Sequence, residues 1–550
     1  MSQGTRMTGG DAIAEALVAN GVDTVFGLPG AQMYPLFDAL QRRADRIATV
    51  GARHEQACGY MAFGYARSTG RPGVFSVVPG PGVLNTTAAL CTAWGCNAPV
   101  LCITGQVPSQ FLGRGRGHLH ELPDQLGTLR SLVKWAARIE RAADAPAVVD
   151  EAFRQMLSGR PGPVAVEMAW DAMAGSGWVR PSLGAVIPPA PPPSPDEIEA
   201  AAGLLLAARR PMIMVGSGAQ HAAAEVLALA EALDAPVAGF RGGRGIVAED
   251  HPLGVSSYAA FRLWPECDAL VGIGTRLEMP YMRWSGMMTL VEAPAAPPHL
   301  VRIDIDPAEM RRLRPHAGVV ADARDGAAAL LDALRRLGRA GTGDRSAIAR
   351  AKAEAAEAVR EVRPHVEYLE AIRSVLPREG ILVEELCQTG FASYFAYPVL
   401  APRTYVSPGF QGTLGCGFMT GLGVKAAHPD RPVVSIAGDG GFMFGVQELA
   451  TAVQHGIGLV TVLFNNGAYG NVLRDQQAGF GGRLIGSELH NPDFQQLAAS
   501  FGVAFRRVAS PAALKPALEE AIRSAGPALI EVAIDRAAET SPWDFIHPKR

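Results

Sequence analysis

The sequence predicts an α/β fold made of three doubly wound, parallel-sheet domains. Short apolar runs alternate with amphipathic segments along the chain, and such alternation implies parallel strands joined by crossover helices. One proline-rich stretch interrupts this pattern, which indicates a boundary between domains. The chain has 550 residues, enough for three or four domains at roughly 100–200 residues each.

We expect the first domain at residues 1–180, the second at 196–340 and the third at 366–550. The stretch 188–195, PPAPPPSP, is a stiff linker between the first two. A charged, alanine-rich helix over 345–363 connects the last two. The strands that we expect are 24–26, 73–78, 100–104 and 163–168 in the first domain, 211–215, 269–273 and 300–305 in the second, and 381–384, 432–437, 459–465 and 528–534 in the third. The helices that we expect in the first domain include 56–67 and 85–96.

Composition excludes several classes of protein. The formal net charge is -3, so nucleic acid and anionic membrane, which need concentrated positive charge, are not expected partners. Hydrophobic residues make up 48% of the chain, which excludes general disorder. No apolar run is long enough to span a membrane, and no signal peptide is visible. The seven cysteines form no CxxC pair, so we expect reduced thiols and a cytoplasmic protein.

Two polar motifs end consecutive apolar strands in the last domain. The sequence GDGG places Asp439 between glycines, and the next strand ends in Asn465-Asn466. In an open parallel sheet, ligands collect at the carboxyl ends of the strands. Asp439, Asn466 and the main-chain oxygen of Ala468 suit Mg²⁺, which prefers oxygen ligands and is usually shared with substrate phosphates. We expect a helix over 446–454 to point its positive end at those phosphates.

The alternative for GDG alone is a capped turn, because Asp beside Gly is a common turn pair. The paired asparagines at the end of the following strand favour the metal site over the turn. With both motifs in place, the chain resembles the thiamine diphosphate-dependent enzymes, in the acetohydroxyacid synthase (acetolactate synthase)-like branch. The segment GDGGFMFGVQELATAVQHG is similar to that branch well beyond the signature. The resemblance covers essentially the whole chain.

The resemblance gives each domain an expected role: pyrimidine-binding for the first, middle and Rossmann-like for the second, diphosphate-binding for the third. It implies thiamine diphosphate and Mg²⁺ as cofactors, with Asp439, Asn466 and Ala468 as metal ligands. It also implies at least a homodimer, or a homotetramer, because family members build the cofactor site from two subunits. The cofactor-binding residues that it implies are Gly30, Glu55, Gly82, Asn85, Gln388, Thr413, Leu414, Gly438, Gly440, Gly441, Tyr469 and Gly470.

Glu55 is the residue on which the expected chemistry depends. It stands in Arg53-His54-Glu55, which resembles the family segment whose Glu contacts the aminopyrimidine ring. A carboxyl group on that ring favours the imino tautomer that activates the cofactor, and we expect it in a dry environment. Taken alone, a Glu before a helix would be a cap or a solvated residue.

Three turns support this assignment, although each has a structural alternative. Phe26–Gln32 resembles the FGxPG turn and Gly80–Asn85 the GPGxxN turn, and either could be an ordinary Gly-Pro turn. Leu414 resembles the residue that bends the cofactor into a V, and an ordinary core leucine fits equally well. Gln388 lies where the family often has a glutamine on the diphosphate side.

Three departures from the synthases bear on the substrate. Asp475 replaces an aromatic residue that selects the acceptor, Pro280 replaces an arginine that pairs with its carboxylate, and His120 replaces a glutamine near the reacting carbon. We expect Glu55, His120 and Gln32 to be catalytic. His118 is an alternative to His120, and either could instead be an ordinary loop histidine; histidine titrates in the range needed to exchange a proton with the substrate oxygen.

The middle domain keeps Val215–Gly218 and Ile303–Pro307, which suit an adenine-ribose ligand or the remnant of its site. FAD is the ligand in the synthases, but Gly254–Phe261 matches poorly, so we keep FAD as an alternative only. The expected function is decarboxylation of a small 2-oxo acid with carboligation to an acceptor. The alternatives are a decarboxylase or C–C lyase without acceptor, and an FAD-linked oxidoreductase of the pyruvate oxidase kind. A regulatory protein that binds the cofactor without turnover is disfavoured, because Glu55 and the metal ligands are present.

Overall fold

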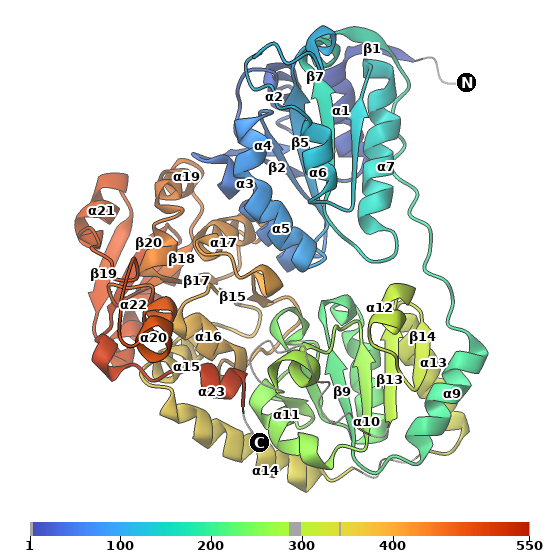
Figure 1. Cartoon of the computed structure of the whole chain (residues 1–550), viewed down its shortest axis with the longest axis vertical. Coiled ribbons are helices and arrows are strands. Elements are labelled where there is room, and N and C mark those ends of the chain that lie inside the picture. The colour runs from blue at the N-terminus through green and yellow to red at the C-terminus, as the bar shows by residue number, and fades with distance from the viewer. Residues whose placement is uncertain (1–3, 285–296, 298, 340, 342, 549–550) are drawn as a thin grey trace.

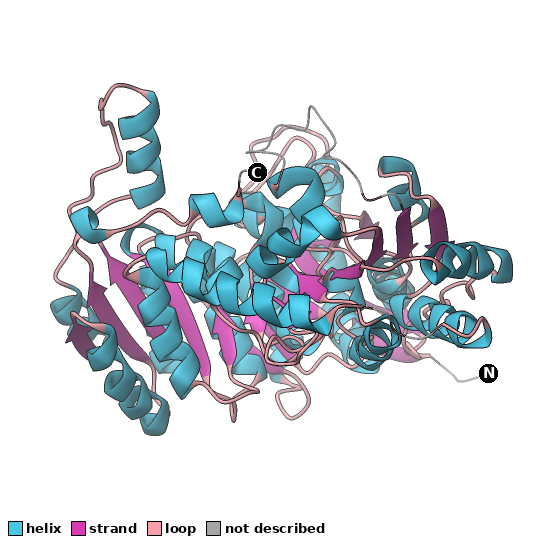
Figure 2. Cartoon of the chain, turned by 90° about the horizontal axis from the view of Figure 1, so that it is seen from below, coloured by secondary structure: helices cyan, strands magenta, loops and turns pink. Residues whose placement is uncertain are grey.

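The structure, a computed structural model, describes residues 4–548 except 285–296, 298, 340 and 342. It consists of an N-terminal, a central and a C-terminal unit (Figure 1), each built on one six-stranded parallel sheet. Helices cover the sheets on both faces (Figure 2). The predicted α/β class is therefore confirmed. No helix within the described residues is both long and apolar enough to cross a membrane.

The N-terminal unit has the strand order β3-β2-β4-β5-β7-β6. Its strands are β2 Thr24–Gly27, β3 Ala48–Gly51, β4 Gly73–Val77, β5 Val100–Gln106, β6 Trp135–Ile139 and β7 Val164–Ala169. Its helices are α1 Gly9–Ala19, α2 Tyr34–Gln41, α3 Glu55–Thr69, α4 Pro81–Asn85, α5 Thr87–Gly95, α6 Gln125–Arg130, α7 Ala145–Leu157 and α8 Trp170–Ala174. A short antiparallel pair, β1 Thr5–Thr8 with β8 Ser176–Val179, joins the two ends of the unit.

Two features of this unit differ from the expectation. The edge strand β6 was not expected, because its sequence, WAARI, lacks a continuous apolar run. The helix expected over 85–96 is α5, Thr87–Gly95, and a short helix that was not expected, α4, precedes it and ends at Asn85, with a break at Thr86. The break turns Asn85 toward Glu55, to which its side chain donates a hydrogen bond.

The central unit has the strand order β11-β10-β9-β12-β13-β14. Its strands are β9 Pro211–Val215, β10 Val237–Gly239, β11 Gly254–Val255, β12 Ala269–Ile273, β13 His299–Asp304 and β14 Ala317–Val320. Its helices are α9 Pro195–Leu206, α10 Ala223–Leu233, α11 Ser257–Leu263, α12 Pro307–Arg312 and α13 Ala323–Arg336. The connecting helix α14, Arg345–Ala358, packs along α11 at the bottom of the molecule (Figure 1).

The C-terminal unit has the strand order β16-β15-β17-β18-β20-β19. Its strands are β15 Ile381–Val383, β16 Tyr405–Val406, β17 Val433–Gly438, β18 Val460–Asn465, β19 Ala504–Val508 and β20 Ala528–Ala533. Its helices are α15 His365–Val375, α16 Gln388–Ala396, α17 Cys416–Ala427, α18 Asp439–Phe442, α19 Leu449–Gln454, α20 Gly470–Gly479, α21 Phe494–Phe501, α22 Pro511–Ser524 and α23 Trp543–Ile546.

The N- and C-terminal units share one hydrophobic core. Helix α3 packs on α17, and buried side chains from both helices belong to the same apolar cluster. The helices cross at glycines: a Cβ at Gly64 would collide with the main-chain oxygen of Thr420, and one at Gly423 with that of Met61. The crossing therefore brings the two helix backbones into direct contact and fixes the N-terminal end of α3 relative to the C-terminal sheet.

Candidate functional site

A cavity lies at the carboxyl ends of β17 and β18, where the sheet topology places ligands. Every described residue that lines it comes from 365–539, within the C-terminal unit. The predicted residues among them are Gln388, Leu414, Gly438, Asp439, Gly440, Gly441, Asn466, Ala468, Tyr469 and Gly470. Thr413 is not one of the lining residues; its Oγ1 lies 3.2 Å from Oγ1 of Thr92 in the N-terminal unit. Ten residues spread over some eighty positions of sequence thus meet around one cavity, which we call the C-terminal cavity.

The helix nearest this cavity differs from the one expected. The four-residue α18 starts at Asp439 itself. Residues 446–454 form a 3-10 turn followed by α19, and none of them is among the residues that line the cavity. The positive helix end expected from 446–454 is therefore not at this site.

The oxygens of Asp439 and Asn466 are oriented by partly buried partners. Asn491 Nδ2 donates to Asp439 Oδ2 at 2.6 Å and to Asn465 Oδ1 at 3.0 Å. Asn466 Nδ2 donates to Glu539 Oε2 at 2.9 Å, and its Oδ1 accepts from the amide of Ala468 at 3.2 Å, so one lone pair of Oδ1 remains to bind a cation. Burial raises the pKa of Asp439, and the hydrogen bond from Asn491 opposes that rise.

The residues present fit Mg²⁺ bound together with phosphate oxygens. Asp439 is 1% exposed and supplies a carboxylate, while Asn466 supplies an amide oxygen. Gln388 Oε1 is buried and has no hydrogen-bond partner in the described part of the chain. Among described residues no group of three or more His, Cys, Asp or Glu side chains is placed to hold a metal ion. A site with so few protein charges suits Mg²⁺, which usually completes its octahedron with water and phosphate.

A buried glutamate holds the turn that carries Leu414. Glu385 is 1% exposed and its Oε1 accepts a hydrogen bond from the amide of Gly415. The same carboxyl group packs against Gly441, where a Cβ would collide with it. Burial raises the pKa of Glu385 to about 8 and that of its neighbour Glu384 to about 7. Glu385 therefore connects the Leu414 turn with the GDGG motif.

A second cluster of predicted residues lies in the N-terminal unit, around the start of α3. Glu55 is the first residue of that helix, and Asn85 Nδ2 donates to its Oε2 at 2.9 Å. A Cβ at Gly82 would lie 3.7 Å from Glu55 Cγ, and one at Gly30 would collide with Val78. The turn at Gly80–Asn85 thus brings backbone close to Glu55, whereas the turn at Gly30 packs on Val78. Glu55 does not line the C-terminal cavity of its own chain.

Gln32 and His120 form a hydrogen-bonded pair beside this cluster. Gln32 Nε2 donates to the carbonyl oxygen of Leu119 at 2.9 Å, so its Oε1 is the acceptor that lies 2.8 Å from His120 Nδ1. The neutral imidazole then carries its lone pair on Nε2. Burial lowers the pKa of His120, and the charge of Glu55 opposes this. Both residues have positive φ, 67° and 66°, a strained conformation that tends to occur at functional sites.

The residues at the three departures are separated in the fold. Asp475 is largely exposed on α20. Pro280 is buried in a π-helical turn, three residues before Arg283, which pairs with Glu278. The ring of His118, the alternative to His120, lies tilted against that of Phe111 with centroids 4.7 Å apart, and His118 forms none of the hydrogen bonds of the Gln32–His120 pair described above.

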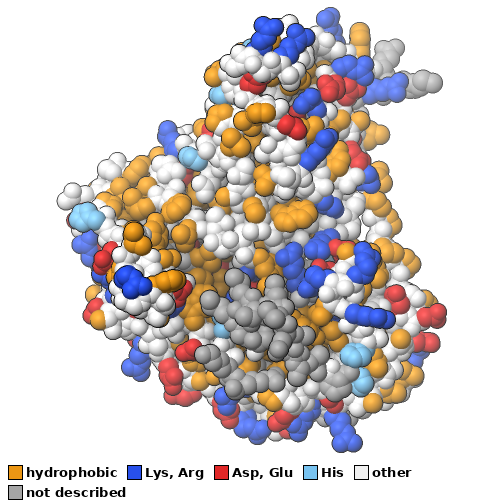
Figure 3. Space-filling view, in the orientation of Figure 1, with side chains coloured by type: hydrophobic (Ala, Val, Ile, Leu, Met, Phe, Trp, Pro, Cys, Tyr) orange, Lys and Arg blue, Asp and Glu red, His pale blue; other side chains and the backbone are white. Residues whose placement is uncertain are grey.

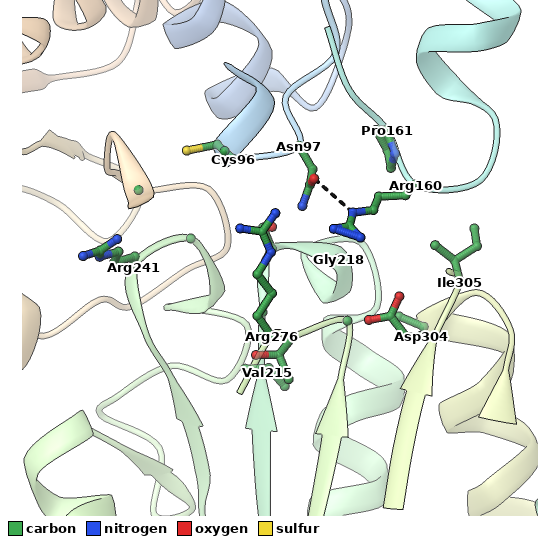
Figure 4. A pocket seen from close by; sticks show the side chains of 18 of the residues that line it. Cys96, Asn97, Arg160, Pro161, Val215, Gly218, Arg241, Arg276, Asp304 and Ile305 are labelled. Carbon is green, nitrogen blue, oxygen red and sulfur yellow. Dashed lines mark hydrogen bonds between the residues drawn. The ribbon is translucent and has the colours of Figure 1, made fainter. Parts of the chain in front are cut away.

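A larger cavity of about 420 Å³ lies where the three units meet (Figure 4). It is lined by the predicted loops Val215–Gly218 and Asp304–Ile305 together with arginines from all three units: Arg67, Arg160, Arg241, Arg276 and Arg403. Basic side chains gather where the N-terminal and central units face each other (Figure 3). We call this the junction cavity.

Arg241 shows that the junction cavity suits an anion. Its side chain is nearly fully buried, and its Nη2 lies 3.6 Å from Glu278 Oε1, whereas its Nε and Nη1 have no hydrogen-bond partner among the described residues. The guanidinium lies against the rings of Phe240, Tyr394 and Phe410 at 5.3–5.5 Å. Burial and the neighbouring Arg67 lower the pKa of Arg403 to about 10. Buried guanidinium groups that face a cavity without partners attract phosphate or carboxylate groups.

Four functional candidates were not identified from the sequence: Glu385, Glu448, Asn491 and Glu539. Each of them contacts a predicted motif on a distant segment of the sequence through a single side chain. No sequence spacing or repeat therefore indicates its role. Asn491 offered a weak signal, because it precedes Pro492 and Asp493 in a segment rich in turn residues. Only the fold places these four against the predicted motifs.

Three descriptions of protein families match the chain. Residues 7–128 match "Thiamine pyrophosphate enzyme, N-terminal TPP binding domain", residues 198–334 match the central domain of the same enzymes, and residues 387–532 match their C-terminal TPP binding domain. The order of the three matches is that of the three units described above.

Several curated proteins are similar over nearly their whole length. A probable 2-ketoarginine decarboxylase of Pseudomonas aeruginosa is 34% identical, with 96% of this chain and 94% of that protein covered. A probable acetolactate synthase large subunit of Methanocaldococcus jannaschii is also 34% identical, with 96% and 92% covered. The large subunit of acetolactate synthase isozyme 1 of Escherichia coli is 30% identical, with 99% and 96% covered.

Proposed function

The chain belongs to the thiamine pyrophosphate enzymes, in their acetolactate synthase-like branch, and on that premise we propose that it decarboxylates a 2-oxo acid and transfers the remaining acyl carbanion to an acceptor carbonyl compound. The observation that carries the proposal is the pairing of Glu55 with Asn85 at the start of α3, together with Asp439 and Asn466 in the C-terminal cavity. One cluster provides a positioned carboxyl group for proton exchange, and the other provides a metal and phosphate site.

Asp439, Asn466 Oδ1 and the main-chain oxygen of Ala468 would hold Mg²⁺ with the diphosphate of the cofactor. When bound, thiamine diphosphate supplies a carbon that accepts the electron pair released when the carboxylate leaves as CO₂. Gly440 and Gly441 admit main-chain amides close to the phosphates at the start of α18. Leu414, on the turn that Glu385 fixes, would support the cofactor between its two rings.

Glu55 would exchange a proton with the aminopyrimidine ring. The hydrogen bond from Asn85 occupies Oε2, so Oε1 remains free for the ring nitrogen. Positioned acid–base catalysis of this kind contributes about 10²- to 10⁴-fold to rate. His120 would exchange a proton with the substrate oxygen through Nε2, the atom that its bond to Gln32 leaves free.

A second copy of the chain would complete the site. The described residues that line the C-terminal cavity all come from 365–539, which supports a site that receives Glu55 from another subunit. Large apolar side chains are exposed beside both clusters: Leu84, Trp94, Met443 and Phe444 are 36–49% exposed. Contact between copies would bury these side chains. We therefore propose a homodimer or a homotetramer of such dimers.

A second candidate function is decarboxylation or C–C cleavage without an acceptor. Pro280 stands where the synthases have the arginine for the acceptor carboxylate, and Asp475 stands at the position that selects the acceptor. One of the 34% identical relatives is named as a probable decarboxylase. A 2-oxo acid that carries its own polar side chain, as 2-ketoarginine does, would lose CO₂, and the product released would be the corresponding aldehyde.

The junction cavity is proposed as a nucleotide site. Its glycine loops and arginines suit an adenine nucleotide with a diphosphate group. FAD remains an alternative ligand, and with it an oxidoreductase of the pyruvate oxidase kind. Because Gly254–Phe261 resembles the flavin-embracing segment of the synthases poorly, we favour a ligand without redox function. The absorbance spectrum of the purified protein distinguishes the two, since bound FAD is yellow.

The decisive test compares wild type with Glu55→Gln on a panel of 2-oxo acids, with and without aldehyde or 2-oxo acid acceptors, and identifies products by mass. We expect Mg²⁺- and thiamine diphosphate-dependent CO₂ release, lowered about 10²- to 10⁴-fold in the variant. A ligated product supports the synthase, and an aldehyde alone supports the decarboxylase. Full activity in Glu55→Gln would refute the mechanism.

A further inference from the structure

The turn that precedes Glu55 is fastened by side chains from the C-terminal unit. The amide of Arg53 donates to both carboxylate oxygens of Glu448, at 3.2 Å to Oε1 and 3.0 Å to Oε2. The amide of Gly51 donates to His455 Nε2 at 3.0 Å, and Arg53 Nη2 donates to Gln454 Oε1 at 2.9 Å. Three side chains from 448–455 thus hold a turn some four hundred residues away in sequence.

Glu448 is the central member of this group. Its side chain is 0% exposed, and Thr451 Oγ1 donates to its Oε2 at 2.6 Å. Burial raises the pKa of Glu448, and its bonds from Thr451 and from the amides of Arg53 and His54 oppose this rise. A buried carboxylate is costly unless donors surround it. Here the donors include two successive main-chain amides directly before Glu55.

The amides that Glu448 holds determine where α3 starts. His54 is the N-cap of α3, with extended φ and ψ, and its Nδ1 accepts the amide of Gln56 at 3.1 Å. Glu55 follows as the first helical residue. Its side chain can reach Asn85 only from the backbone position that the turn gives it, so fixing the amides of 53 and 54 fixes the origin of the Glu55 side chain.

We propose that Glu448 is a positioning residue for Glu55, acting through the main chain of Arg53 and His54. The inference rests on the proposed role of Glu55 and adds the group that aims it. Glu448 lies nine residues after Asp439 in the sequence, so the segment that carries the metal ligand also holds the turn that carries the catalytic carboxylate. A displacement of about 1 Å at such a group lowers turnover by about 100-fold.

Glu448→Gln tests the proposal because it keeps the shape of the side chain and removes one acceptor. A carboxylate offers two acceptor oxygens, whereas an amide offers one and turns an NH₂ group toward the N–H or O–H donors. We expect hydrogen exchange at the amides of 53 and 54 in the cofactor-free protein to accelerate by about 10-fold or more. We expect kcat to fall about 10- to 100-fold with little change in KM or in affinity for thiamine diphosphate and Mg²⁺.

Two further variants separate positioning from loss of stability. Glu448→Asp restores both acceptor oxygens, and we expect it to recover part of the kcat that Glu448→Gln loses. Glu249→Gln alters another glutamate, which is largely buried and bound to Arg244 where the central unit meets the C-terminal unit. We expect it to lower thermal stability while exchange at 53 and 54 and kcat stay near wild type.

The outcomes are distinct. Fast exchange at 53 and 54 with unchanged kcat, or a kcat loss equal in Glu249→Gln, overturns the proposal for Glu448. Unchanged exchange in Glu448→Gln overturns it as well. If Glu55→Gln itself stays fully active, the proposed function fails instead, and the exchange data still report whether Glu448 holds the turn.

Discussion

The two clusters differ in how far a single chain completes them. In the C-terminal cavity, Asp439 is 1% exposed and the oxygens of Asp439 and Asn466 are oriented by Asn491 and Glu539. Around Glu55, the carboxyl group is only partly buried and Asn85 is exposed. The first cluster, which we call the closed cluster, is therefore assembled within the chain. The second cluster, around Glu55, remains partly exposed to solvent, and we call it the open rim. This contrast agrees with the proposal that one chain holds the diphosphate end of the cofactor and that a second copy of the chain completes the pyrimidine end.

The largest expected effect comes from removing the charge in the closed cluster. Asp439→Asn keeps the size of the side chain but takes away the anionic ligand. We therefore expect affinity for Mg²⁺ with thiamine diphosphate to fall by more than about 100-fold, which exceeds the loss expected when a residue that only hydrogen-bonds to a metal ligand is removed. Isothermal calorimetry measures this directly. The control is Asp332→Asn, a change at an exposed position on α13, and equal affinity in the two variants would contradict the assignment.

At the open rim, His120→Ala should lower kcat by about 100-fold, toward the lower end of general acid–base effects, and leave cofactor affinity unchanged. The pH profile gives a sharper result. Because burial lowers the pKa of His120 below the ordinary 6.5, the neutral imidazole persists on acidification, and wild-type kcat should decline only below that value. The variant should lack this acidic limb. A variant that retains both kcat and the limb would remove His120 from the mechanism.

The smallest expected effect is on the pH dependence of stability, and it concerns Glu385, the buried glutamate that supports the Leu414 turn. Burial raises the pKa of Glu385 to about 8, from an ordinary 4.5, so between these values the folded state holds a proton that the unfolded state has lost. Stability from this group is therefore greatest at low pH and falls as pH rises toward 8. Glu385→Gln cannot titrate, and we expect its melting temperature to decline less, by a few degrees, between pH about 5 and about 8.5.

Thermal denaturation of the cofactor-free protein at the two pH values measures this difference. Glu384 stays in both proteins, and because its charge raises the pKa of Glu385, the comparison reports Glu385 together with its coupling to Glu384. Parallel declines for wild type and variant would show that Glu385 does not hold a proton in the folded protein.

Much of the fold could be predicted from the sequence, because parallel-sheet units have a strong local signal. The strand ending in Asp439 and the strand ending in Asn465 were recognisable from apolar runs followed by polar residues, and the topology then had to bring their ends together. Glu55 could be predicted from its resemblance to a known segment. The weak strand β6 and the short helix α4 were missed, because packing rather than local pattern determines them.

The partners of the predicted residues could not be predicted in the same way. Asn491, Glu539 and Glu448 each contribute one side chain from a segment with no motif, and their roles depend on distances set by the tertiary fold. Glu448 stands within a segment that the sequence did single out, but as part of an expected helix aimed at the phosphates. In the structure Glu448 instead accepts a hydrogen bond from the turn before Glu55.

The glycine contact between α3 and α17 limits how this enzyme can move. At Gly64 and Gly423 no side chain separates the two helix backbones. The N-terminal and C-terminal units therefore have no side chains at these points that could rearrange to let the helices slide or hinge. We therefore expect access for substrates, and any adaptation to new ones, to come from loops and from the proposed interface between copies of the chain. The N-terminal and C-terminal units should therefore move together as one rigid body. We expect natural variation in specificity to be concentrated in loops rather than at the contact between α3 and α17.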